Sequence, residues 1–452
     1  MKHLHNLSEQ ICVFTASDAW RRWMAMIKRI GVIVLAEVIA LSCPWYLRRR
    51  IYCQLRWFWA PILLATIVIV MGIFPRFGDN ALHHASLPVK LFWPGILKEF
   101  EQVFPIPDEL QHHVAFWKDV FARYTSSQVI LYDSWYFQVI YEVVDTQTSP
   151  GINAHIQKYK HILLELDRKQ RKDQLHSLSG DEARVYKLFE NIPDPQKFRK
   201  AASQHFRLQS GQRDHFVKAV ERAGLYQEQF EQIFQKHDLP RELIWLSLVE
   251  SYFKQSAYSS AGAAGVWQFM PATAKMYGLR INAQVDERYD PFKSANSAAR
   301  LLKANYDIFG SWPLAITAYN HGTAGVLNAV KQVKTTDLGK IVREYQGSSF
   351  GFYSRNYYAE FVAAAHIMYD YKRYLGPIEQ LTPLEYEKVP VTQKIYVKDL
   401  VKNLSIPEET FVMLNRELKR TVIQSKSPLP HNFVLKIPPG KKDQFLKYYN
   451  NL

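Results

Sequence analysis

The pattern of apolar and polar positions divides the chain of 452 residues into stretches of different character. Residues 57–74 (WFWAPILLATIVIVMGIF) are 18 residues without a charge; as a helix they would span about 27 Å, roughly one bilayer core. Residues 92–235 place Leu, Phe, Lys, Glu and Gln at helical spacing, as in 157–173 and 211–237. The pattern predicts a transmembrane anchor followed by a mainly helical domain.

Two other stretches depart from the helical pattern. Residues 128–144 (QVILYDSWYFQVIYEVV) are rich in β-branched and aromatic residues, a composition that favours strands or a hairpin. Residues 390–440 mix two β-like runs, QKIYV and NFVLKIP, with helical pieces at 397–404 and 408–414. We expect a small α+β module of about fifty residues there.

Composition and charge narrow the classes of protein. The mean hydropathy of -0.23 and 48% apolar residues argue against a disordered chain and against a polytopic membrane protein. The chain has 57 Lys and Arg against 42 Asp and Glu, a net charge of +15. This excess predicts attraction to an anionic partner: nucleic acid, a membrane surface or an acidic polymer such as cell wall. Charge alone does not choose among these.

The basic residues before the apolar run predict its orientation. Residues 1–60 carry nine Lys or Arg and three acids, and Arg48, Arg49, Arg50 and Arg56 immediately precede the run. The positive-inside rule therefore places residues 1–56 in the cytoplasm and the body outside. An earlier apolar stretch, residues 30–41, contains an acid and is short for a span, which leaves a second membrane element as an open alternative.

Cysteine and histidine usage gives no sign of a metal or a cofactor. Cys12, Cys43 and Cys53 all precede the predicted anchor, and no CxxC pair or zinc-type cluster occurs. The body without thiols suits an oxidising compartment. The sequence also has no HExxH and none of the glycine-rich motifs that bind nucleotide phosphates. We expect neither a metal site nor a bound cofactor.

Glu250 is the first candidate for chemistry. Asp238 and Pro240 are typical of a helix start, and the following LIWLSLVES continues as a helix. Leu243, Leu246 and Glu250 fall on one stripe, so the carboxyl should point inward. Burial and the negative end of the helix would both raise its pKa, as a general acid requires. The alternative is a solvated acid that merely ends the helix.

A segment of small residues follows this helix. The five residues 261–265 (AGAAG) allow a close approach of backbone to backbone or to a ligand. Trp267 and Gln268 could offer an apolar face for a sugar beside an amide. Tight packing is the alternative reading. Pro271 then opens a helix that Gly278 closes.

The acids that follow along the chain have structural explanations. Asp290 and Pro291 read as the cap and first turn of a helix, and Asp286 and Glu287 read as surface or structural charges. None of these three acids needs a catalytic role to explain it.

Four motifs occur together: VES at 249–251, AYSSAGAAGVWQFMPATAKMYGL at 257–279, DERYDP at 286–291 and AITAYNHGTAGV at 315–326. In this order they resemble the transglycosylase domain of lytic murein transglycosylases of the membrane-bound D type, in glycoside hydrolase family 23. The likeness covers about 140 residues. It implies an α-rich, lysozyme-like domain over residues 236–375.

The resemblance also implies the site. It makes Glu250 the single catalytic acid and base, with Ser251 supporting it. The other positions matched to the family are those of the wall of its sugar groove, its tyrosine-asparagine pair and a later tyrosine that contacts the acid region: Gly265, Gln268, Met270, Tyr319, Asn320 and Tyr358. The glutamate and valine of the family's later Glu-Thr-x-x-Tyr-Val element are replaced here.

The reaction implied by the resemblance cleaves the MurNAc-GlcNAc bond of peptidoglycan without water and leaves a 1,6-anhydro end. Residues 385–452 resemble a divergent LysM-type glycan-binding module, through Leu414, Asn415 and the LKIP at 435–438. With the anchor, this implies a single-pass protein of the bacterial inner membrane whose periplasmic body binds glycan strands and no nucleic acid. A lysozyme-like hydrolase and a non-catalytic wall-binding scaffold are the alternatives.

Overall fold

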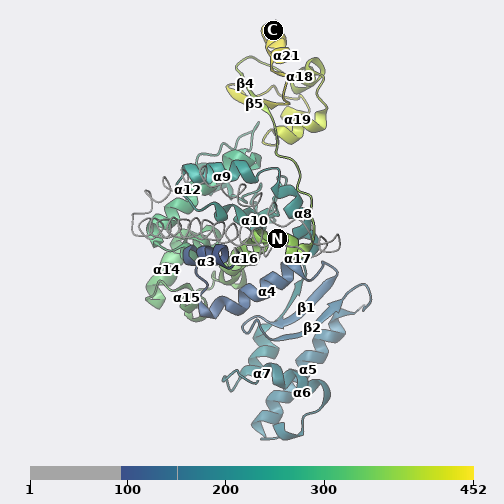
Figure 1. The fold of residues 1–452 in the computed structure, drawn as a ribbon, viewed down its shortest axis with the longest axis vertical. Coiled ribbons are helices and arrows are strands. Elements are labelled where there is room, and N and C mark those ends of the chain that lie inside the picture. The colour runs from purple at the N-terminus through teal and green to yellow at the C-terminus, as the bar shows by residue number, and fades with distance from the viewer. Residues whose placement is uncertain (1–92, 150) are drawn as a thin grey trace, which may run out of the picture. The chain divides into compact units, whose positions relative to one another are not determined.

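The computed structural model describes residues 93–149 and 151–452. The predicted cytoplasmic segment 1–56, the anchor 57–74 and the possible membrane element 30–41 lie outside these residues. Among the helices that the structure describes, none combines the length and the apolar character needed to cross a bilayer. The predicted predominance of helix is confirmed (Figure 1).

The N-terminal region begins with helices and continues into a small sheet. Helix α3 (Trp93–Val103), the 3-10 turn η2 (Asp108–Leu110) and α4 (Gln111–Ala122) precede the strands. The predicted hairpin is confirmed, because antiparallel pairing joins β1 and β2 with Val129 opposite Val144. The antiparallel sheet has the order β2-β1-β3. Its strands are β1 (Gln128–Asp133), β2 (Ile140–Asp145) and β3 (Phe206–Ser210).

One face of this sheet is covered by the helices that connect β2 to β3 (Figure 1). Their apolar side chains form a separate core with the sheet, in which Leu131, Tyr141, Leu163 and Phe189 are buried. Aromatic and β-branched residues thus build the sheet in the middle of a helical region. The connecting elements are α5 (Ile152–Arg171), η3 (Leu175–Ser177), α6 (Gly180–Leu188), α7 (Lys197–Lys200) and the π-helical turn η4 (Ala201–His205).

The largest core continues through the middle of the chain. It joins Phe100 and Val114, Phe216 and Phe230 with the helices that follow residue 236. The helices before and after the predicted boundary at 235 therefore pack in one core. These helices are α8 (Arg213–Ala223), α9 (Gln227–Lys236), η5 (Arg241–Trp245), α10 (Leu246–Ser251), α11 (Pro271–Met276), η6 (Glu287–Tyr289), α12 (Pro291–Phe309), α13 (Trp312–His321), α14 (Thr323–Val333), α15 (Leu338–Glu344), α16 (Phe352–Tyr369) and α17 (Tyr371–Leu375).

The C-terminal part has the predicted mixture of helices and strands. Strands β4 and β5 pair antiparallel, with Val389 opposite Leu435, and the helices pack on them in a core of their own. The prediction of a strand at QKIYV is wrong: the strand lies earlier in the chain and Val397 begins a helix. The elements are β4 (Glu387–Val391), α18 (Val397–Leu404), α19 (Glu408–Leu414), α20 (Arg420–Ile423), β5 (Phe433–Ile437) and α21 (Lys442–Tyr449).

A buried group of charges ties this C-terminal part to the rest of the fold. Nζ of Lys436 on β5 lies 2.6 Å from Oδ2 of Asp290 and 2.7 Å from Oε1 of Glu417. Asp290 also caps α12, since its Oδ1 accepts from the backbone amides of Phe292 and Lys293 at 3.0 Å. Backbone bonds run alongside, from the amide of Asp286 to the carbonyl of Glu417 at 2.8 Å. All three charged side chains are almost fully buried.

Candidate active site

Glu250 lies near the end of the short helix α10, most of whose residues are buried. The segment opens as the 3-10 turn η5 and becomes α-helical only at Leu246, so the predicted single helix is divided. Leu243 and Leu246 are fully buried, as the apolar stripe predicted, and Glu250 is partly buried. Tyr252, with φ of 53°, ends α10 in the left-handed region. Helix α10 packs against α16.

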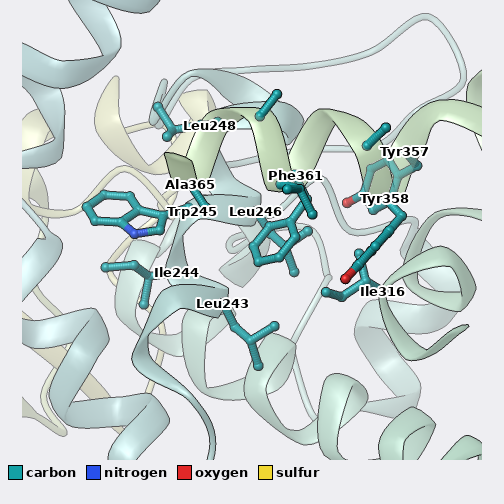
Figure 2. Packing of buried hydrophobic residues seen from close by; sticks show 14 of the residues in the cluster. Leu243, Ile244, Trp245, Leu246, Leu248, Ile316, Tyr357, Tyr358, Phe361 and Ala365 are labelled. Atoms are coloured by element: carbon teal, nitrogen blue, oxygen red, sulfur yellow. The ribbon is translucent and has the colours of Figure 1, made fainter. Parts of the chain in front are cut away.

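Helix α16 supplies the hydrogen-bond partner of Glu250, but not from the predicted residue. The hydroxyl of Tyr357 donates to Oε1 of Glu250. Tyr358 points elsewhere, and its hydroxyl donates to the carbonyl of Pro105 at 2.9 Å; the two side chains leave α16 in different directions (Figure 2). The prediction of a contact from Tyr358 is therefore wrong.

The surroundings of Glu250 favour its neutral form. Burial raises the pKa of Glu250 to about 7, and the hydrogen bond from Tyr357 opposes this rise because it stabilises the carboxylate. This environment agrees with the expectation that the side chain of Glu250 points inward and has a raised pKa. A carboxyl with a pKa near neutrality can both donate and accept a proton near physiological pH.

Three hydrogen bonds hold the small-residue segment beside Glu250. Oγ of Ser251 donates to the carbonyl of Val266 at 2.8 Å. The hydroxyl of Tyr319 on α13 donates to the carbonyl of Trp267 at 2.8 Å. Nε2 of Gln268 donates to the carbonyl of Gly265 at 2.8 Å. The structure thus brings Ser251, Gly265, Gln268 and Tyr319 together around one loop, and burial together with the charge of Glu250 raises the pKa of Tyr319.

Met270 and Asn320 lie at the exposed edge of the same region. Met270 is 43% exposed just before α11, which begins at Pro271 as predicted. Asn320, near the end of α13, is exposed, and its Oδ1 accepts from Oγ of Ser354 at 3.3 Å. Trp267 is fully buried against Phe234, with ring centroids 5.3 Å apart. The expectation that Trp267 offers a face to a sugar is therefore wrong.

Gly265 is required by the backbone. Its φ is +81°, and a Cβ at this position would lie 1.9 Å from the carbonyl oxygen of Arg288. A side chain at this position would therefore meet backbone and not a side chain that could move aside. The AGAAG segment was expected to allow a close approach of another group, and at Gly265 that group is the backbone of Arg288.

We predict that Gly265→Ala destabilises the protein by about 2 to 3 kcal/mol, because it adds both the left-handed backbone strain and the clash with Arg288. Urea denaturation followed by circular dichroism measures this loss. Gly262→Ala is the control: it shares a positive φ, 93°, but its Cβ would find only the hydroxyl of Tyr258, at 3.7 Å. Equal losses for the two variants would contradict the role of the clash.

The nearby acids in the sequence are structural, as predicted. Asp286 forms a bidentate pair with Arg288, whose guanidinium also donates to the carbonyls of Gly262 and Phe269. Glu287 pairs with Lys293 at 2.7 Å. These carboxyls are buried and not at the surface. They hold the loop that carries Gly265.

A carboxyl that the sequence did not single out lies on α16, the helix that supplies the hydrogen-bond partner of Glu250. Glu360 follows Tyr357 by three residues on α16, so it lies one turn further along the same stripe. Burial first, and then the charge of Glu250, raise the pKa of Glu360 to about 8. Residues three positions apart share one face of a helix, so the sequence of 353–360 places Glu360 on the same face as Tyr357. Identifying Tyr357 as the partner of Glu250 would therefore also have pointed to Glu360.

Part of the chain matches a known domain family, and several known proteins are similar to it in sequence. The model of the transglycosylase SLT domain matches residues 229–342. The chain is 30% identical over 246 residues to the membrane-bound lytic murein transglycosylase D of Escherichia coli strain K12, an alignment that covers 50% of each chain. It is 37% identical over 101 residues to the peptidoglycan transglycosylase gp16 of Escherichia phage T7, covering 22% of this chain and 7% of that protein.

Among solved structures, the 70 kDa soluble lytic transglycosylase of Escherichia coli aligns with a TM-score of 0.28 and 23% identity, over 33% of this chain and 24% of that one. The chain spans about half the length of the D-type relative that it matches. The matched residues include Glu250, Gly265, Gln268 and Tyr319. Residues 229–342 thus match the transglycosylase SLT domain, in a chain that is similar over half its length to membrane-bound lytic murein transglycosylase D.

Proposed function

We propose that the protein is a lytic murein transglycosylase that cleaves the MurNAc-GlcNAc β-1,4 bond of peptidoglycan. One observation carries the proposal: within an SLT domain, Glu250 is held by Tyr357 in surroundings that raise its pKa to about 7. The acids Asp286, Glu287 and Asp290 are engaged in structural pairs. We therefore assign the roles of acid and base to Glu250 alone.

In the proposed reaction Glu250 first acts as the acid. Its carboxyl proton passes to the bridging oxygen as the bond from that oxygen to the anomeric carbon of MurNAc breaks. The carbonyl oxygen of the substrate's own N-acetyl group stabilises the electron-poor carbon. The Glu250 carboxylate then takes the proton of the MurNAc 6-hydroxyl, and that oxygen forms the new bond to the anomeric carbon. The product is a 1,6-anhydro end, and no water is consumed.

The other site residues have supporting roles in this proposal. Ser251, Tyr319 and Gln268 donate to backbone carbonyls of the segment 265–267, so we assign them to shaping the groove around the acid. Met270 and Asn320 are the exposed members of the set and are assigned to contact with the glycan. In this proposal Ser251, Tyr319 and Gln268 position the loop, and Met270 and Asn320 contact the sugar.

We further propose that residues 57–74 anchor the chain in the bacterial inner membrane and that the body acts in the periplasm, where peptidoglycan lies. The apolar run with its preceding arginines supports this placement. The D-type relative is named as a membrane-bound transglycosylase. Residues 385–452 are proposed as a LysM-like module. The buried Lys436 triad ties this module to the SLT domain.

We predict that Tyr357→Phe slows cleavage about ten- to a hundredfold, because a hydrogen bond to the charged form of Glu250 is lost. Without that bond the pKa of Glu250 rises further above its ordinary value. Glu250 is active when protonated, so the fall of activity at alkaline pH moves to higher pH. A pH profile of muropeptide release measures both effects. Tyr358→Phe is the control and should not move the midpoint, because Tyr358 bonds to Pro105.

The proposed function is tested by digesting purified peptidoglycan sacculi with the protein. We expect release of soluble muropeptides with no matching rise in reducing ends, because the anhydro end has no free anomeric hydroxyl. A rise in reducing ends equal to the number of bonds cleaved would indicate hydrolysis and overturn the lyase reaction. Absence of any release would overturn the proposed activity.

A further inference from the structure

A cavity of about 660 Å³ lies at the start of α16, and the proposed cleavage does not use it. Its volume falls within the range of small-molecule sites in proteins. Glu250, Tyr319, Asn320 and Tyr357 do not line it. Its wall comes from parts of the chain that lie far apart in sequence: η2 with the start of α4, the turn between β1 and β2, the loop before α7, and the segment from α15 to α16.

Aromatic side chains form the apolar part of this wall, and other rings hold them in place. Phe137 stacks on His113 with ring centroids 3.9 Å apart, and on Phe352 at 6.4 Å. Trp135 stacks on His205 at 5.7 Å. Rings packed in this way give a cavity a fixed shape, and its few polar groups then decide what it binds.

Arg355 is the cation of the wall that has no acid beside it. Its guanidinium donates to the carbonyls of Phe350, Val342 and Tyr345, which fixes its orientation. A guanidinium has five N–H donors, so these three bonds leave two donors free. Among the described residues no carboxylate pairs with Arg355, and burial lowers its pKa. The cavity therefore contains a partly buried positive charge without a counter-ion from the described chain.

Asp108, the first residue of η2, is the free anion of the same wall. It is exposed, and it forms no ion pair and no side-chain hydrogen bond with any residue that the structure describes. The other acids that line the cavity have cations: Glu109 pairs with Arg343 at 3.4 Å, and Asp194 pairs with Lys200 at 2.7 Å. One positive and one negative group thus remain for a ligand.

The two free charges select the chemistry of the ligand. A neutral ligand would displace water from both and leave each unpaired, which costs free energy. A guanidinium pairs well with a carboxylate, and a carboxylate pairs with an ammonium group. A short peptide with free carboxyl and amino groups satisfies both. In peptidoglycan the sugars are uncharged where a peptide stem is attached, and the stems carry both kinds of group.

The cavity lies close enough to the proposed acid for one substrate to occupy both places. Phe352, Arg355 and Asn356 line the cavity from the first turns of α16. The next residue, Tyr357, bonds to Glu250. A helix with its side chains is about 10 to 12 Å across, and an extended peptide of four residues reaches about 14 Å. A stem on the sugar held at Glu250 is thus long enough to reach the cavity.

We propose that this cavity binds the peptide stem of peptidoglycan, with a stem carboxylate at Arg355 and a stem amino group at Asp108. This inference rests on the proposed function and deepens it, because it adds recognition of the peptide to cleavage of the glycan. No bond is made or broken at the cavity. Its effect is a preference for strands that carry stems, and the cleavage itself stays with Glu250.

Two variants test the cavity without touching the proposed acid. Asp108→Asn removes the free anion, and Gln138→Trp places a large ring at an exposed position of the wall. On intact sacculi we expect Asp108→Asn to raise KM about two- to fivefold, the effect of losing one exposed ion pair, with kcat unchanged. Gln138→Trp should raise KM at least as much, because it fills the space that the stem needs.

The same variants are then compared on glycan strands from which an amidase has removed the stems. There both should keep the wild-type KM. Asp307→Asn, the same change at an exposed acid on α12, is the matched control and should leave KM unchanged on both substrates. Wild-type KM for both cavity variants on sacculi, in proteins with native circular dichroism, would overturn the inference. An equal rise on sacculi and on stripped strands would indicate a sugar site and overturn it too.

A binding measurement separates this inference from the proposed function. Isothermal titration calorimetry with a free stem tripeptide that ends in diaminopimelate needs no cleavage. If the wild type releases nothing from sacculi but binds the tripeptide, and Asp108→Asn weakens that binding, the proposed function fails and the peptide site stands. If the wild type cleaves sacculi but does not bind the tripeptide, the peptide site alone fails.

Discussion

Glu250→Gln is expected to lower the rate of muropeptide release by about 10²- to 10⁴-fold, the contribution that a positioned acid and base makes to catalysis. The amide keeps the shape of the side chain and can still accept the hydrogen bond from Tyr357. It has no proton of suitable acidity for the bridging oxygen. Release of ultraviolet-absorbing muropeptides from sacculi measures the rate.

The matched control for this variant is Glu344→Gln, which makes the same change at an exposed acid on α15. Glu250→Gln is also expected to keep the stability of the wild type, because burial penalises the charged form of Glu250 and the amide is neutral. Wild-type release by Glu250→Gln would exclude Glu250 as the acid. Loss of release in both variants would point to damage unrelated to the acid.

Lys436→Met is expected to destabilise the protein by about 3 to 5 kcal/mol, because it leaves two buried carboxyls without their cation. Asp290 and Glu417 would then face one another, and both lie almost fully buried. The loss affects the cap of α12 as well, since the same carboxyl of Asp290 holds the first amides of that helix. Chemical denaturation measures the free energy of unfolding.

Lys388→Met is the control for the triad. Lys388 lies opposite Lys436 in the β4–β5 register but is exposed and forms no ion pair among the described residues. We expect a change of about 0.5 kcal/mol or less for this variant. A Lys436→Met loss no larger than the control would contradict the view that the triad stabilises the joined C-terminal part.

Local signals predicted most of the secondary structure. The hairpin follows from β-branched and aromatic residues, and α12 begins where Asp290 and Pro291 predict a cap. The QKIYV segment has a strand composition, but β5 pairs with the preceding Glu387–Val391 instead. Pairing partners and register are tertiary properties, and composition alone does not select between two neighbouring β-like segments.

The site was predictable where one helix or one motif determines it. The stripe of Leu243, Leu246 and Glu250 predicts an inward acid, and the raised pKa follows from burial. Tyr357 was missed because it lies more than a hundred residues along the chain, and only the packing of α16 on α10 brings it to Glu250. Trp267 was misjudged because an aromatic residue in a loop is equally suited to a core.

The mass of the sugar end released from peptidoglycan tests the central claim most directly. The full-length protein is incubated with sacculi, and the soluble muropeptides are separated and weighed by mass spectrometry, with Glu250→Gln run in parallel. The account predicts that wild-type products end in 1,6-anhydro-MurNAc, lighter by one water than a reducing MurNAc end, and that the variant releases few of them. Products that end in reducing MurNAc would contradict it.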